Sequence, residues 1–170
     1  MTGRQLPLFA ARQTVDEARA AVLAGARDGG CVCPCCGRFV RVYRRRLHAE
    51  MARFMIRLYR LDCRTGVQWH STREVLGDRG GNKASTDATY LIHWGLIERS
   101  DAENTAGAPA GMLRLTPLGV AFVERRATAP SHVALLNNER LADDQDAAEI
   151  GIDTALGKRF SYDEMMGRDA

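Results

Sequence analysis

Two neighbouring stretches decide the fold: TYLIHWGLIERS at residues 89–100 and GMLRLTPLGVAFV at residues 111–123. The first continues a run at 85–94 that is helical in period, and Gly95 stands where a helix commonly ends in a left-handed residue. Residues 96–99 then read as a strand, 100–111 as a small polar loop and 112–115 as the returning strand. Thr116 is a plausible N-cap with Pro117 in the first turn, so a packing helix follows the predicted hairpin.

The residues before this hairpin supply the rest of a small core. The span 47–61 is predicted to be a helix, because its apolar residues recur at spacings that fall on one face: Leu47, Met51, Phe54, Met55 and Leu58. Residues 67–69 can form a short strand. Ser71 and Glu74 make a capping box that opens a brief helix, which Gly77 closes.

Taken together, residues 47–126 resemble the winged helix-turn-helix domains of bacterial and phage transcription regulators. The resemblance implies an α+β, mainly α fold in which the helix ending at Gly95 reads DNA and the hairpin forms the wing. The DNA-facing residues would then be the exposed ones of this helix: Lys83, Ser85, Thr86, Thr89, Tyr90 and His93. Alternatively, Tyr90 and His93 merely cover the edge of the domain. The wing carries Asp101 and Glu103 but no Lys or Arg, so we do not expect it to enter the minor groove.

Four of the five cysteines are crowded into the sequence CVCPCCG at residues 31–37. The CPxCG part resembles the knuckle of zinc ribbons, in which two thiolates two residues apart bind one tetrahedral ion. Cys33 and Cys36 are the expected pair, and a second CxxC is missing. The other ligands would come from Cys31, Cys35, Cys63, His48 or His70, with Cys63 and His70 as first choice. The alternative is a compact turn of reduced thiols without metal.

Arginines dominate the stretch after the knuckle. One cluster comprises Arg41, Arg44, Arg45 and Arg46, and a second set recurs along the predicted helix at helical spacing: Arg53, Arg57, Arg60 and Arg64. A solvated charged face would explain such a run. Because like charges on one face of a helix repel each other, we favour an anionic partner that neutralises them. The residues expected to contact DNA phosphates are Arg44, Arg45, Arg46, Arg53, Arg57 and Arg60.

The flanks complete the predicted organisation. Residues 1–30 form a tail and a helix capped by Thr14 and Glu17, 31–46 the knuckle and basic segment, 47–126 the central domain, and 127–170 an acidic extension. In the extension, Asn137 and Asn138 favour the turn of a small hairpin. The helix near residues 14–26 has no obvious core to join, and winged-helix regulators commonly act in pairs, so we expect a homodimer.

Composition limits the function. A net charge of +3 with 45% hydrophobic and 26% charged residues is typical of a folded domain. No stretch approaches the roughly 18 apolar residues of a membrane span, and no signal peptide is evident, so we expect a cytoplasmic protein. Catalytic motifs are lacking, which predicts that the protein is not an enzyme.

Two functions fit these features. The first is a regulator that binds double-stranded DNA through the winged helix and the arginine surface. The second is a phage or mobile-element factor that docks on a host protein or nucleoprotein machine and inhibits or modulates it. The arginines favour the first function, whereas the acidic wing and C-terminus favour the second.

Overall fold

Helices and short strands are interspersed along the chain, which is of the α+β class. The computed structural model describes residues 14–77, 87–101, 108–141 and 147–167. It divides into two units, one formed by residues 1–43 with 135–139 and the other by 44–134 with 140–170. Lys83, Ser85 and Thr86 lie outside the described residues.

The first unit contains helix α1 (Val15–Arg27) and a small hairpin, β1 (Cys31–Val32) with β2 (Phe39–Val40). The predicted capping box is confirmed: the Glu17 N–H donates to the Thr14 hydroxyl over 3.3 Å, and the Thr14 N–H donates to the Glu17 carboxylate over 2.8 Å. The strands pair antiparallel, with Val32 opposite Phe39, and α1 packs on β1. This packing gives α1 a partner that its sequence did not reveal.

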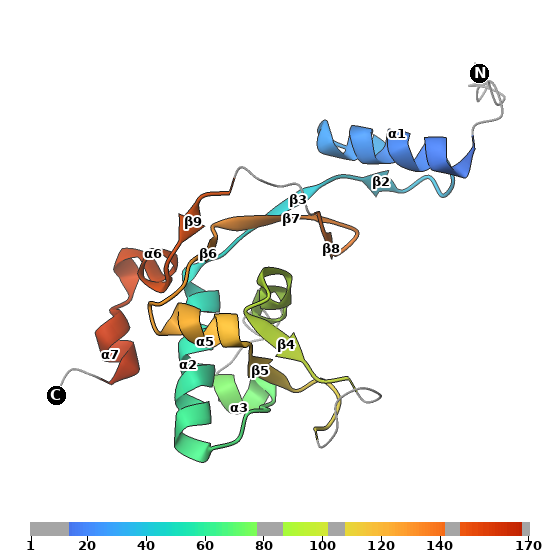
Figure 1. Cartoon of the computed structure of the whole chain (residues 1–170). Helices are drawn as coiled ribbons and strands as arrows, with labels where there is room; N and C mark the ends of the chain where they lie inside the picture. The colour runs from blue at the N-terminus through green and yellow to red at the C-terminus, as the bar shows by residue number, and fades with distance from the viewer. Residues whose placement is uncertain (1–13, 78–86, 102–107, 142–146, 168–170) are drawn as a thin grey trace, which may run out of the picture. The chain divides into compact units, whose positions relative to one another are not determined.

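Helix α2 (Ala49–Thr65) is the central element of the second unit (Figure 1). Its buried face includes Met51, Phe54, Met55 and Leu58, as the apolar spacing predicts. It packs against β5 (Leu113–Leu115) and four helices: α3 (Thr72–Leu76), α5 (Pro117–Val123), α6 (Ile152–Leu156) and α7 (Tyr162–Met166). The predicted capping box of α3, between Ser71 and Glu74, is also confirmed.

The segment between α3 and α5 contains a helical turn and a hairpin. Residues 87–89 are helical and continue into the 3-10 helix η1 (Tyr90–Trp94), which ends at Gly95 with φ +69°. Strand β4 (Ile97–Arg99) pairs antiparallel with β5. Instead of the strand expected at 67–69, His70 forms a single antiparallel bridge to Leu113, with N···O distances of 2.9 and 2.8 Å. In the described residues, the backbone at His70, which precedes α3, therefore lies beside the β4–β5 hairpin.

Helix α5 lies very close to the start of β4. The Thr116 hydroxyl caps α5 by accepting the Gly119 N–H over 3.0 Å, and it donates to the Gly95 carbonyl over 2.6 Å. The Thr116 N–H donates to the Leu96 carbonyl over 3.1 Å. These bonds confirm the predicted cap and fasten the helix to the preceding turn.

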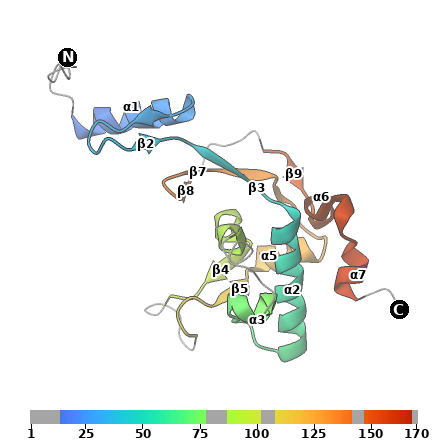
Figure 2. The same ribbon diagram turned by 180° about the vertical axis from the view of Figure 1, so that it is seen from behind.

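The C-terminal extension returns to the second unit. Strand β6 (Ala129–Pro130) pairs with β9 (Glu149–Ile150), and α6 and α7 lie beside α2 (Figure 2), with η2 (Gly157–Arg159) directly after α6. A three-stranded sheet has the order β3 (Tyr43–Arg46), β7 (His132–Leu136), β8 (Glu139–Arg140). Asn137 and Asn138 both have positive φ between β7 and β8, as expected for a tight hairpin turn.

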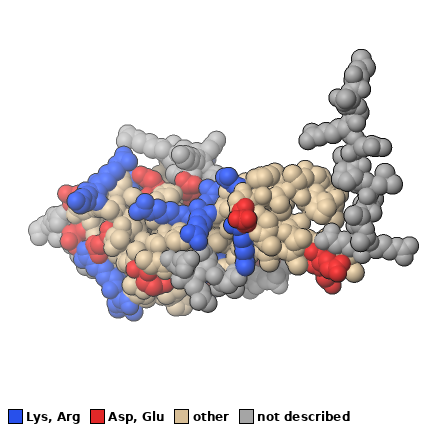
Figure 3. Space-filling view, turned by 90° about the horizontal axis from the view of Figure 1, so that it is seen from above, with Lys and Arg blue, Asp and Glu red and all other residues tan. Residues whose placement is uncertain are grey.

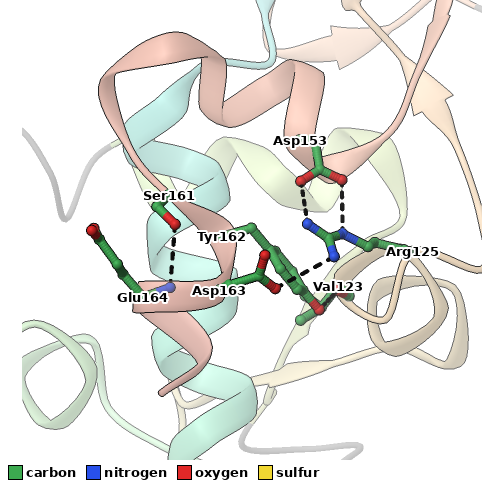
Figure 4. Close-up of polar contacts among 7 residues, drawn as sticks. All are labelled: Val123, Arg125, Asp153, Ser161, Tyr162, Asp163 and Glu164. Atoms are coloured by element: carbon green, nitrogen blue, oxygen red, sulfur yellow. Dashed lines mark hydrogen bonds and ion pairs between the residues drawn. The ribbon is translucent and has the colours of Figure 1, made fainter. Parts of the chain in front are cut away.

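Arg125 fixes the extension to the end of α5 (Figure 4). Its guanidinium makes two hydrogen bonds to Asp153, of 2.9 and 2.6 Å, and lies 3.5 Å from Asp163. It also stacks 3.7 Å from the ring centroid of Tyr162, whose hydroxyl donates to the Val123 carbonyl over 2.8 Å. The hydrogen bonds to Asp153 raise the pKa of Arg125.

Replacing Arg125 with Ala is expected to destabilise the chain by about 1 kcal/mol, since the ion pairs are half exposed and screened by water. Urea unfolding measures this change, and limited proteolysis should show earlier cleavage near residues 150–166. Arg126→Ala is the control variant. It removes the same charge from an exposed residue whose ion-pair partner, Glu124, is two positions earlier in the chain. If both variants are cleaved alike, Arg125 does not hold the extension.

Candidate nucleic-acid interface

The basic segment of β3 lies against the 3-10 helix η1. The Arg45 guanidinium stacks 4.5 Å from the ring centroid of Tyr90, and its Nη2 donates to the Tyr90 hydroxyl over 3.3 Å. Arg44 and Arg46 flank it, and all three arginines are exposed. The arginine cluster and the helical segment that ends at Gly95 are separate groups in the sequence, and the structure brings Arg45 and Tyr90 together across 45 positions of the chain.

A shallow hollow of about 170 Å³ marks this meeting point. It is lined by Arg44, Arg45, Arg46, His48, Met51, Asp87 and Tyr90. The His48 Nε2 lies 3.6 Å from the Asp87 carboxylate, so the hollow contains one acidic group among its cations. A phosphate oxygen could meet several guanidinium donors here.

The helical segment that carries Tyr90 has distinct inner and outer faces. Ala88, Leu91 and Trp94 are buried, and the Trp94 Nε1 donates to the Pro130 carbonyl over 2.6 Å. On the other side, the Tyr90 and His93 rings lie 5.9 Å apart and are partly exposed, as is Thr89. The described residues therefore present Thr89, Tyr90 and His93 beside the basic segment.

The arginines of α2 differ from the single exposed stripe that their spacing suggested. Arg53 makes hydrogen bonds of 3.0 and 2.8 Å to Glu50 and stacks 4.3 Å from the Phe160 ring centroid. Arg60 donates to the Met165 carbonyl over 2.6 Å. Both side chains thus hold the C-terminal extension, which helical periodicity within α2 cannot reveal.

A second basic region lies toward the other end of α2. Arg57, Arg60 and Arg64 line a groove of about 500 Å³ beside α3, together with Glu74 and apolar residues. Arg57 and Arg64 are exposed. Among the described residues, those predicted to contact DNA therefore fall into two groups, one around Tyr90 and one along α2.

The molecular surface mixes charges of both signs. On the face that Figure 3 shows, Lys and Arg side chains are interspersed with Asp and Glu side chains. In the hairpin, Arg114 is paired with Glu98 at 2.5 Å and stacks 4.4 Å from the Trp69 ring centroid, while residues 102–107 lie outside the described ranges. Binding of an anion would therefore depend on local clusters of arginine rather than on a uniformly basic face.

The β1–β2 turn carries Cys33 and Cys36, the two cysteines of the predicted knuckle. Backbone hydrogen bonds from Cys36 and then Cys35 lower the pKa of the Cys33 thiol. The Gly37 N–H donates to the Cys33 carbonyl over 2.9 Å, and Gly37 has φ +70°, a conformation that favours glycine. Because a thiolate is the form that binds metal, this turn suits one half of a tetrahedral zinc site.

The other two expected ligands, Cys63 and His70, lie in the second unit. His70 is 4% exposed, and its Nε2 lies 2.9 Å from the Asp62 carboxylate and 2.8 Å from the Val67 carbonyl. Burial raises the pKa of Asp62, although His70 acts in the opposite direction. Cys63 is exposed, with its thiol beside Tyr59. Across the described ranges, no group of three or more Cys, His, Asp or Glu side chains is arranged to hold a metal ion.

Comparisons of the chain with protein families, curated proteins and solved structures found no match. Of the helices that the structure describes, none combines the length and the apolar character needed to cross a lipid bilayer.

Proposed function

We propose that this chain binds double-stranded DNA as a winged helix-turn-helix regulator. Support comes first from the order of elements in the second unit, namely α2, the His70 bridge, α3, the helical segment 87–94, the β4–β5 hairpin and α5. The helical segment 87–94 precedes the hairpin, and Trp94 anchors it on its buried face. Such a helix is suited to entering the DNA major groove and contacting the bases. The protein would act by binding and not by catalysis.

The observation that carries the proposal is the stacking of Arg45 on Tyr90. It places exposed guanidinium groups next to the outer face of the helical segment. Arginine side chains of this kind neutralise phosphates and set the position of the protein on the duplex. Thr89, Tyr90 and His93 would then carry the sequence preference, since hydroxyl and imidazole groups can bond to base edges.

A salt titration of duplex binding tests the proposal. The variant Arg44→Ala, Arg46→Ala should weaken binding to all duplexes and flatten the log–log salt slope by up to about 1.8, or roughly 0.9 per phosphate contact. The variant Arg57→Ala, Arg64→Ala is the matched control, because it removes the same charge from exposed positions of the other basic region. We expect it to keep nearly the native slope.

Two results would contradict this assignment. Equal losses in both variants would show that DNA follows the whole basic surface and not the Tyr90 region. No binding of the native chain to any duplex at low salt would remove the DNA function. The arginines beside Tyr90 would then be assigned to docking on an acidic surface of a host protein.

A further inference from the structure

We propose that Cys33 and Cys36 form one half of a zinc site and that a second copy of the chain supplies the other half. The resulting site would hold one zinc ion with four thiolates on a two-fold axis. This inference does not depend on DNA binding. It rests on the donors that one chain offers and on the surface around the β1–β2 turn.

The unit that carries the turn lacks a complete set of suitable donors. Its described residues, 14–43 and 135–139, include Cys31, Cys33, Cys35 and Cys36 but no histidine, and no group of three or more donors among them is arranged for a metal ion. The Cys31 thiol donates to the Val22 carbonyl over 3.5 Å and packs against α1. His70 is enclosed beside Asp62. The turn itself therefore offers the Cys33 and Cys36 pair, whereas a structural zinc ion requires four ligands.

The surface beside the two thiols is apolar and uncovered. Val32 and Phe39 are cross-strand neighbours that flank the turn, and they are 62% and 60% exposed. Such side chains gain free energy when a partner removes them from water. A second copy supplies both missing features, because a two-fold axis through the metal would bring together two identical pairs of thiolates and two identical apolar patches.

The decisive measurement combines the zinc content of the full-length chain with its mass in solution. We expect one zinc ion per two chains and a dimeric mass, with conversion to monomers when a strong chelator removes the metal. At a concentration of free zinc held constant by a metal buffer, the fraction of chains with bound zinc should rise with protein concentration. A site contained in one chain would show no such dependence.

Variants separate the shared site from a general loss of folding. Cys33→Ser with Cys36→Ser should lose zinc and yield monomers, whereas Cys63→Ser should keep both the stoichiometry and the mass. Val32→Glu leaves all thiols in place and puts like charges at the interface, so it should weaken dimerisation and zinc binding together. Full zinc binding by monomeric Val32→Glu would overturn the proposal.

Three results with the native chain would also overturn it. These are one zinc ion per monomeric chain, absence of zinc from protein purified under reducing conditions, and a zinc-free dimer linked by a disulfide. Electrophoresis without reductant identifies the last of these.

Discussion

Replacing Gly119 with Ala is expected to destabilise the folded chain by about 3 kcal/mol, at the upper end of the cost of overpacking. A Cβ atom at this buried position would overlap the Leu96 carbonyl oxygen and lie 2.9 Å from its carbon. It would also lie 3.2 Å from the Leu115 side chain. The Leu96 carbonyl cannot retreat easily, because it accepts the Thr116 N–H where α5 begins.

The sign of this change in the free energy of unfolding distinguishes helix propensity from tertiary packing. In an exposed helix, Gly→Ala would stabilise by up to about 1 kcal/mol, so local propensity and tertiary packing predict opposite results. Urea unfolding measures the difference. Gly151→Ala is the matched control, since a Cβ atom added there would have no atom within 4 Å and the residue has φ −87°; it should change stability by less than about 1 kcal/mol. Equal stability of Gly119→Ala and the native chain would contradict the close approach of α5 to β4.

Trp94→Ala is expected to cost about 3–5 kcal/mol, as do other truncations of large core aromatic residues. Its side chain is 2% exposed, and the indole N–H donates to the Pro130 carbonyl. The substitution removes a core side chain and also the bond that ties the helical segment 87–94 to β6. Thermal or urea unfolding at pH 7 gives the change in the free energy of unfolding.

Two further variants resolve the contributions of Trp94. Trp94→Phe keeps most of the apolar volume and should cost roughly 1–3 kcal/mol, mainly from the unpaired Pro130 carbonyl and the smaller ring. Ile92→Ala truncates an apolar residue of the same helix that is 39% exposed, and it should cost less than about 1 kcal/mol. If Trp94→Ala costs no more than Ile92→Ala, Trp94 does not anchor the helix.

The sequence predicted the features that depend on neighbouring residues. The Thr14 and Ser71 capping boxes, the Thr116 cap and the apolar face of α2 all arise from contacts within a few turns of one helix. The Asn137–Asn138 turn is equally local. Such patterns are visible in sequence because spacing alone determines which side chains meet.

Features that join distant segments were not predictable in the same way. Arg60 and Met165 are separated by 105 positions, and Arg125 and Asp153 by 28, so no local spacing relates them. The candidate site also combines features that the sequence predicts with contacts that it cannot predict. Residue type indicated that Arg45 and Tyr90 were suited to nucleic acid, but only the fold places one on the other. In the same way, the burial of His70 beside Asp62 could not be read from its distance in sequence to the cysteines.

The docking of the C-terminal extension also brings opposite charges together within the second unit. In sequence, an arginine-rich stretch is followed much later by an acidic end, which suggests a large dipole. In the second unit, Arg125 meets Asp153 and Asp163, so opposite charges cancel at short range. Charges paired in this way attract a distant polyanion less strongly than unpaired charges and contribute less electrostatic steering of diffusional encounters. Recognition of an anionic partner by this chain would therefore depend on contacts formed after collision and less on long-range attraction.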